Sequence, residues 1–453
     1  MKRPNFLAGL AAAACIAASG PVGAETLTDA LVASYRNSGL IAQNRAVLRA
    51  ADEDVAQAVA SLRPVFAYAV GSSYANNTVG DDFSGNLAVT GNMLLYDFGR
   101  TQLAIDAAQE TVLATRAALV DIENTVLLNT VDAYMAVRRA QAFINLRQNN
   151  VRLLTEQLRA TRDRFEVGEV TRTDVSLAEA RLAAARSGLA AEQGGLARAQ
   201  EQYKAVIGQY PANLAAPPSP PAIPGTEEAA RSVARTENPQ IDQVQHQVKA
   251  VELIAEQAAR GMYPSLNASG RAAIDDDGDD SLSLGLDLSG PIYQGGAIAS
   301  AVRKAQAQKD QVRAQLYTTG LLVDQQVGNA YANLAVAIAS IDASNRQVRA
   351  AQLALEGVRE ELQLGARTTL DVLDREQELL DAQTDLVSAQ VDRYTAVYQV
   401  LDAMGLLTAE RLGLNVPIYD PSAYYNAVKD APGFGVSREG QRLDRVLKSI
   451  GKE

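Results

Sequence analysis

Two kinds of hydrophobic pattern alternate along the chain and predict long helices joined to short strands. Residues 27–62 and 226–262 are alanine-rich and end close to a proline, which a helix interior does not tolerate. Residues 100–167 and 297–364 are much longer stretches of strong helix formers such as Ala, Leu, Gln, Glu and Arg. A helix of that length extends about 100 Å, so it has to pack lengthwise against other helices.

A shorter helical stretch follows each long one, at residues 173–207 and 370–404. Gly168 and Gly365 stand between the long and the shorter stretches. Glycine often ends a helix because it adopts a left-handed backbone without a steric penalty. The two glycines are therefore expected to mark the turns between successive helices.

Ahead of each long helix, apolar and polar residues alternate. Residues 281–289 place Leu on one face and Ser, Gly or Asp on the other, and residues 266–274 and 87–95 alternate in the same way. Residues 65–74 are less regular. Strands of about ten residues with one apolar and one polar face are typical of an outer-membrane barrel. A soluble β-sandwich would show the same alternation, but four strands attached to such long helices make no core of their own.

Four strands are too few for a closed barrel, whose smallest members have about eight. An open sheet edge cannot face lipid, because its backbone amides would have no partner. Several chains must therefore pool their strands. Closure predicts an oligomer, but it does not fix the number of chains.

The chain contains an internal duplication. A shift of 197 positions superimposes Tyr96 on Tyr293, Tyr134 on Tyr331, Thr171 on Thr368, Asp174 on Asp371 and Gly208 on Gly405. Such periodicity indicates one structural unit used twice. The expected organisation is a signal peptide at 1–24, a first repeat at 25–214 (helix, β-hairpin, long helix, helix), a proline-rich linker at 215–225, a second repeat at 226–416 and a charged tail at 417–453 that lies along the helices or is partly disordered.

The first 24 residues have the pattern of a secretory signal. Lys2 and Arg3 precede an apolar stretch, and small residues precede a cleavage site after Ala24. A lipoprotein signal cleaved before Cys15 is the minor alternative, since the alanines before Cys15 lack the usual leucine. Cys15 is the single cysteine, so the mature chain forms no disulfide.

Composition excludes several functions. Without Lys2 and Arg3 the chain has 40 basic and 53 acidic residues, a balance that argues against a nucleic-acid partner. No apolar run is long enough for a membrane-spanning helix. The sequence offers no nucleophile with a base, no metal-ligand cluster and no phosphate loop, so we expect no enzyme, cofactor or metal. The aspartates of residues 275–280 could bind calcium, but a solvated loop is favoured, and His246 is expected to be a surface or packing residue.

Several motifs, taken in order and found twice, resemble the TolC family. Arg164-Phe165-Glu166-Val167-Gly168 followed by Thr173-Asp174-Val175, and residues 364–374, resemble the helix-tip motifs of that family. Residues 290–296 and 95–99 resemble its junction between strand and helix. The resemblance covers nearly the whole mature chain up to about residue 416.

This resemblance implies a fold that is mainly α with membrane β. Three chains would form a twelve-stranded outer-membrane β-barrel, four strands from each, continued by a long periplasmic α-helical coiled-coil barrel. The function implied is a passive exit duct for drugs or polypeptides, embedded in outer-membrane lipid. A periplasmic adaptor protein and an inner-membrane pump would be its partners.

The resemblance also assigns roles to individual residues. Matched by position, Asp371 and Asp374 would line the pore constriction, and Arg367, Thr173 and Asp174 would form the gate links. Leu362 stands where the family has a linking tyrosine, so one hydrogen bond is expected to be missing. The helix tips that would contact the adaptor are Val167, Gly168, Leu364 and Gly365.

Simpler interpretations of these residues stay open. Asp371 and Asp374 lie three apart on one helix face, where acids near a helix start also satisfy its terminal amides. Crowded in a ring, they would attract cations and raise some of their own pKa values. Arg367 is either a solvated loop residue or a link to a neighbouring helix, for example to Asp174.

Two other classes of protein compete with the exit duct. A periplasmic adaptor would have one helical hairpin and a compact β-rich domain, and a structural coiled-coil protein would lack the β-hairpins and the tip motifs. The sequence does not separate drug efflux from protein secretion.

Overall fold

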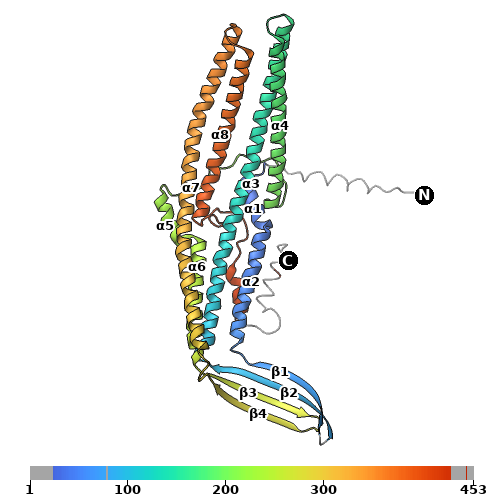
Figure 1. The fold of residues 1–453 in the computed structure, drawn as a ribbon, viewed down its shortest axis with the longest axis vertical. Helices are drawn as coiled ribbons and strands as arrows, with labels where there is room; N and C mark the ends of the chain where they lie inside the picture. Colours follow the sequence, from blue (N-terminus) through green and yellow to red (C-terminus); the bar gives the residue numbers. More distant parts are fainter. Residues whose placement is uncertain (1–23, 78–79, 430–444, 446–453) are drawn as a thin grey trace, which may run out of the picture. The chain divides into compact units, whose positions relative to one another are not determined.

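The computed structural model describes residues 24–77, 80–429 and 445 (Figure 1). The predicted signal segment, apart from Ala24, and the predicted tail beyond Lys429, apart from Arg445, lie outside the described residues. In chain order the elements are α1 (Leu27–Asn37), α2 (Gly39–Ala60), β1 (Val65–Asn77), β2 (Gly80–Tyr96), α3 (Arg100–Glu166), α4 (Arg172–Ile207), α5 (Glu227–Glu237), α6 (Pro239–Ala259), the 3-10 helix η1 (Arg260–Met262), β3 (Ser265–Asp275), β4 (Asp280–Ser289), α7 (Ala297–Gln363), α8 (Thr369–Ala403) and α9 (Pro421–Val428).

The long helices have the predicted extent, but the helices ahead of the strands do not. Both α3 and α7 contain 67 residues. The single helices expected over residues 27–62 and 226–262 are each two helices, separated at Ser38 and at Asn238, whose backbones are extended with ψ of 115° and 123°. The Asn238 side chain accepts the Gln240 N–H at 2.9 Å, and Pro239 occupies the first position of α6, where its missing N–H is not needed.

The chain folds into two compact units. Of the described chain, the first unit comprises residues 24–38, 129–221 and 334–398, and the second comprises residues 39–128, 222–333, 399–429 and 445. Each of the helices α3 and α7 contributes one end to each unit. No helix in the described part of the chain combines the length and the apolar character needed to cross a membrane.

The four strands of the second unit form one antiparallel sheet in the order β1-β2-β3-β4 (Figure 1). Tyr68 pairs with Val89, Val89 with Ala272, and Ala272 with Leu282, so these four side chains share one face. Within the described chain, β1 and β4 are each paired on one side only.

One face of this sheet is apolar and exposed, as the alternation predicts. Phe66, Tyr68, Leu282 and Leu284 are between 75% and 82% exposed. The intervening positions carry Thr90, Arg271 and Ser283, which pair with one another on the opposite face. A sheet that turns large apolar side chains away from its own chain is suited to lipid contact.

Glycines make room on the apolar face for its largest side chains. A Cβ at Gly91 would lie 3.0 Å from the ring of Phe66, and a Cβ at Gly270 would lie 3.2 Å from Leu284. Phe66, Gly91, Gly270 and Leu284 are register partners across the four strands. The two glycines therefore let the flanking side chains lie over the central strands.

Helices α2, α3 and α9 of the second unit pack around a small core. Leu48, Val55 and Val112 are buried there, and Tyr419 and Tyr425 pack against them. The Tyr424 hydroxyl donates to Glu53 on α2 at 2.7 Å. The predicted tail thus begins with a segment that is fixed on α2.

His246 is a paired residue rather than a plain surface one. Its Nδ1 lies 2.6 Å from the Glu110 carboxylate on α3, and its Nε2 lies 3.5 Å from Asp242 on α6. The imidazole therefore joins α6 to α3 within the second unit.

Both repeats end their second long helix in the same way. Gly208 and Gly405 adopt left-handed backbones with φ of 93° and 75°. Asn37 Nδ2 donates to the carbonyl of Ile207, and Asn238 Nδ2 donates to the carbonyl of Ala403, at 3.1 and 2.9 Å. An asparagine from the short-helix pair therefore binds a carbonyl at the end of the long helix in each half.

Tyrosines at equivalent positions hold the segment between the halves. The Tyr134 hydroxyl lies 3.1 Å from the Glu25 carbonyl and 2.7 Å from the Ala215 carbonyl in the first unit. In the second unit, the Tyr331 hydroxyl donates to the Pro224 carbonyl at 2.7 Å.

Candidate gate at the helix tips

The first tip is the turn between α3 and α4 in the first unit. Gly168 has a φ of 81°, and the N–H groups of Gly168 and Glu169 donate to the carbonyls of Phe165 and Arg164. Thr171 begins α4 with a capping box, in which its hydroxyl accepts the Asp174 N–H and Asp174 accepts the Thr171 N–H at 2.9 Å. The turn is thus closed by its own backbone and by one reciprocal cap.

The second tip, between α7 and α8, repeats this geometry 197 positions later. Gly365 has a φ of 76°, and Ala366 N–H donates to the carbonyl of Glu361 at 2.9 Å. Thr368 and Asp371 form the equivalent cap, with the Thr368 N–H 2.9 Å from the Asp371 carboxylate. The backbone hydrogen bond from Thr368, reinforced by its hydroxyl, holds the pKa of Asp371 below its ordinary value. This cap opposes any rise in the pKa of Asp371 from neighbouring carboxylates.

The ion pairs of the two tips have opposite polarity. At the first tip, Arg164 at the end of α3 pairs with Glu169 of the turn at 3.1 Å. At the second tip, Glu361 at the end of α7 pairs with Arg367 of the turn at 2.7 Å. The helix supplies the base of the pair at the first tip and the acid of the pair at the second, although the backbones of the two turns match.

The structure does not bring all the predicted gate residues together within one chain. Arg367 pairs with Glu361 and Asp174 is held by Thr171, so the suggested bond between Arg367 and Asp174 is not formed within the described chain. Thr173 is exposed on the first turn of α4. Links from these residues to another chain stay a prediction.

Asp374 is joined to the first half of the chain. Its Oδ1 accepts a hydrogen bond from Nη2 of Arg181 on α4 at 2.6 Å, within the first unit. Leu373, its neighbour on α8, is 2% exposed and packs into a core with Ala178 and Leu182 of α4. Sequence reasoning missed Arg181 because 193 residues separate the pair and no local motif connects them.

A second type of ion pair recurs below each tip at the repeat spacing. Arg162 on α3 pairs with Glu179 on α4 at 2.5 Å, and Arg359 on α7 pairs with Glu376 on α8 at 2.9 Å. The Glu376 side chain is 5% exposed, whereas the Glu179 side chain is 48% exposed. Each pair ties together the two helices of one tip.

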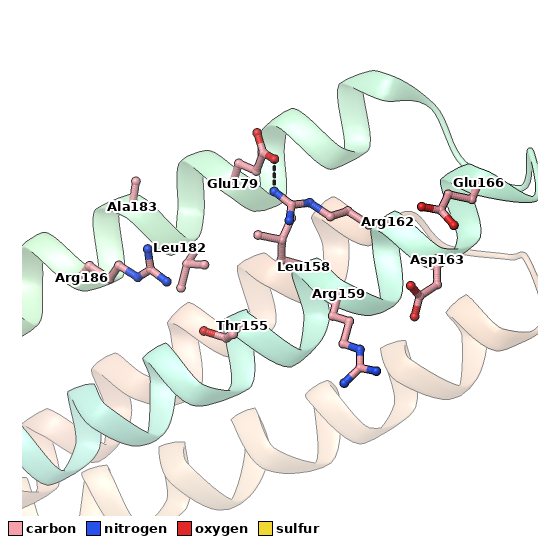
Figure 2. A pocket seen from close by; sticks show the side chains of 10 residues that line it. All are labelled: Thr155, Leu158, Arg159, Arg162, Asp163, Glu166, Glu179, Leu182, Ala183 and Arg186. Atoms are coloured by element: carbon pink, nitrogen blue, oxygen red, sulfur yellow. Dashed lines mark hydrogen bonds and ion pairs between the residues drawn. The ribbon is translucent and has the colours of Figure 1, made fainter.

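A groove lies between α3 and α4 just below the first tip (Figure 2). Its volume is about 550 Å³, and Figure 2 shows the Arg162–Glu179 pair spanning it. Leu158 and Leu182 supply apolar surface between the two helices. The lining residues are Thr155, Leu158, Arg159, Arg162, Asp163, Glu166, Glu179, Leu182, Ala183 and Arg186.

The tips present apolar side chains outward. Val167 is 72% exposed and Leu364 is 84% exposed.

Among the described residues, no cluster of three His, Cys, Asp or Glu side chains is placed to hold a metal ion. In the acidic turn between β3 and β4, Asp275 Oδ1 accepts the backbone N–H of Asp279 at 2.8 Å.

The chain has two β-hairpins, each followed by a long helix and a second helix, and the hairpins form one sheet with an exposed apolar face. This arrangement defines the class of outer-membrane channels that continue into a helical tunnel. The sequence model of the family described as outer membrane efflux protein matches residues 31–209 and again residues 230–406. The chain belongs to this family.

Individual relatives agree with this assignment. The chain is similar to the outer membrane efflux protein BepC of Brucella suis, with 34% identity over 90% of this chain and 91% of that protein. It is similar to the alkaline protease secretion protein AprF of Pseudomonas aeruginosa, with 26% identity over 64% of this chain and 63% of that protein. The crystal structure of CusC superposes with a TM-score of 0.77 and 17% identity, covering 84% of this chain and 92% of that one, which shows a shared fold.

The protein is therefore an outer-membrane exit duct of the kind used in efflux or type I secretion, with a large periplasmic part. The family match extends over both halves of the chain, so the alternatives of a periplasmic adaptor and of a structural coiled-coil protein are wrong. Its homologues are transport channels.

Proposed function

We propose that three copies of this chain assemble into one passive channel, without catalytic activity, in which each copy supplies β1–β4 to a twelve-stranded barrel. The observation that carries this proposal is the sheet, with its exposed apolar face and its outer strands β1 and β4 paired on one side only. Pairing β4 of one copy with β1 of the next would satisfy the backbone of both edges, as lipid requires.

The helix tips are proposed to close the periplasmic end of the channel. Asp371 and Asp374 would line the constriction, and Arg367, Thr173 and Asp174 would link neighbouring helices across chains. Arg367 and Asp374 are half exposed and Thr173 is exposed, which leaves them accessible to such contacts. Leu362 cannot donate the hydrogen bond of a tyrosine, so this closure has one polar link fewer than the family pattern.

The partners proposed are a periplasmic adaptor and an inner-membrane pump. The exposed side chains of Val167 and Leu364, beside the turns at Gly168 and Gly365, offer the adaptor an apolar contact at each tip. The cargo would be drugs or polypeptides. Higher identity to BepC than to AprF favours efflux over protease secretion.

Single-channel conductance of the purified mature protein in a planar bilayer tests the channel and its acidic entrance. The expected result is small, stable, cation-selective steps that a trivalent cation blocks from one side only. Protein that stays in solution without detergent and gives no steps would refute the proposal.

Variants separate the gate from the constriction. Arg367→Ser is expected to raise the conductance, because the proposed charged link from Arg367 to a neighbouring helix is lost and the closed end is held less firmly. Asp371→Ala combined with Asp374→Ala is expected to abolish block by the trivalent cation, because the ring loses its charge. Unchanged conductance and unchanged block would contradict both assignments.

A further inference from the structure

The contact between Arg181 and Asp374 differs from every other ion pair described at the tips. The tip pairs described above join residues of one helix pair, whereas Arg181 lies on α4 and Asp374 lies on α8. The Nη2–Oδ1 distance is 2.6 Å, and the two side chains are 40% and 44% exposed. The pair thus connects the first and second halves of the chain while part of each charged group still faces solvent.

A packed apolar contact fixes the position of this pair. Leu373 precedes Asp374 on α8, and Leu182 follows Arg181 on α4, and both leucines belong to one buried core. Ala178, 1% exposed, completes the contact from the preceding turn of α4. Because the neighbours of both charged residues are buried together, the guanidinium and the carboxylate are held within reach of each other.

The duplication did not generate this pair. The shift of 197 positions matches Asp374 with Leu177 and Arg181 with Glu378. Since leucine carries no charge, the equivalent residues cannot form a second copy of this ion pair. The caps at both tips and the pairs Arg162–Glu179 and Arg359–Glu376 do recur. The Arg181–Asp374 pair is therefore an addition to the repeated framework and is not needed to build either helix pair.

The other acids at the start of α8 have partners within their own half. Asp371 is capped by Thr368, Glu376 pairs with Arg359, and Glu378 pairs with Arg375 at 2.5 Å. Among the described residues, Arg181 is the cation that pairs with Asp374. The net charge that Asp374 presents to solvent thus depends on a side chain from the other half of the chain.

We propose that Arg181 is a specificity-determining residue of the channel, because it neutralises Asp374 at the constriction and ties α4 to α8. This inference rests on the proposed function, since it takes Asp374 as a pore-lining residue. With the pair formed, the charge of Asp374 is neutralised in each chain, and Asp371 supplies the remaining carboxylate of the two. A half-exposed pair is weak, so it can break and reform without unfolding the helices.

The test compares Arg181→Gln with the wild-type channel in planar bilayers at low salt. Removing the guanidinium is expected to raise the cation selectivity and to lower the blocking concentration of a trivalent cation about tenfold, because one carboxylate per chain is no longer compensated. Arg346→Gln is the matched control, since Arg346 pairs with Asp342 on the exposed surface of α7 in the same unit. Arg181→Lys keeps the charge and is expected to keep the wild-type block.

Exchanging the two charges separates the two effects of Arg181: the positive charge that it adds at the constriction, and the ion pair by which it joins α4 to α8. The double variant Arg181→Asp with Asp374→Arg can form the same pair with reversed polarity. It is expected to keep the small, stable steps of the wild type, and to leave the channel less sensitive to the trivalent cation than Arg181→Gln.

The outcomes identify which idea fails. A wild-type protein that forms no blockable channel refutes the proposed function, and this inference falls with it. A wild-type channel that is blocked, with Arg181→Gln blocked at the same concentration as Arg346→Gln, overturns the role of Arg181 alone.

Discussion

Replacing Asp52 with asparagine is expected to stabilise the second unit at neutral pH. Asp52 on α2 is completely buried, and neither carboxylate oxygen has a hydrogen-bond partner among the described residues. Burial raises the pKa of Asp52 to about 6, although the charge of Arg116 on α3 lowers it. Glu53 adds a small further rise.

The Arg116 guanidinium attracts the Asp52 carboxylate without hydrogen-bonding to it, and two arginines of this region lie over tyrosine rings. Arg116 lies over the ring of Tyr425 at 5.4 Å, and Arg45 lies over the ring of Tyr419 at 4.8 Å. Burial and the charge of Asp52 raise the pKa of the Tyr419 hydroxyl as well. The segment that carries α9 therefore covers a buried, ionisable group.

The magnitude follows from the difference between the folded and unfolded pKa values. A rise from 3.8 to about 6 corresponds to about 3 kcal/mol at pH 7. The folded state binds more protons than the unfolded state between these values, so the wild type loses this stability as pH rises from about 4 to about 6. The attraction to Arg116 is already contained in this pKa. The buried amide of asparagine would itself lack a hydrogen-bond partner at this position, so we expect a net gain of about 1–2 kcal/mol at pH 7.5.

The assay is thermal unfolding of the full chain in detergent, followed by circular dichroism at pH 4 and pH 7.5. Asp52→Asn is expected to raise the unfolding temperature by a few °C at pH 7.5, with little or no gain at pH 4. Asp54→Asn is the control, because Asp54 is exposed on the same helix. A loss of stability at pH 7.5, or an equal gain at both pH values, would refute the reasoning.

Three further predictions concern the repeated contacts. Gly405→Ala is expected to cost at least about 2 kcal/mol, because its Cβ would lie 2.3 Å from Pro239, whereas Gly413→Ala, in open space, should cost about 1 kcal/mol; equal unfolding temperatures would contradict this. Tyr134→Phe is expected to cost about 1–2 kcal/mol and to raise hydrogen exchange at Ala215, since the carbonyls of Glu25 and Ala215 lose the one hydroxyl donor that they share; unchanged exchange would count against the contact. Thr368→Ala is expected to cost about 1 kcal/mol and to raise the pKa of Asp371 toward its ordinary value, which carbon-13 NMR titration would detect; an unmoved pKa would exclude the cap as its cause.

The periodic features of the fold could be read from the sequence. The alternation in residues 281–289 predicted a strand with an exposed apolar face, and the structure has β4 over Asp280–Ser289 with Leu282 and Leu284 exposed. The glycines Gly168 and Gly365 predicted the two tips, because a left-handed backbone there needs glycine. Both features are set by the residues that are close to each other along the chain, which is why the sequence alone predicts them.

The features that were missed depend on contacts between distant residues or on weak local signals. The break before α6 had a signal, the dipeptide Asn238–Pro239, which is a helix start in itself. No pattern in the sequence joins Arg181 to Asp374, or marks Asp52 as buried without a partner, because both depend on how separate helices pack.

The reversed ion pairs at the two tips have a consequence for stoichiometry. A partner that contacted the turn at Gly168 would meet an ion pair with its base on the helix and its acid in the turn, and at Gly365 it would meet a pair in the opposite order. One protein surface cannot be complementary to both dipoles at once. A partner composed of identical subunits must therefore bind the two kinds of tip through different residues, or bind one kind more tightly than the other.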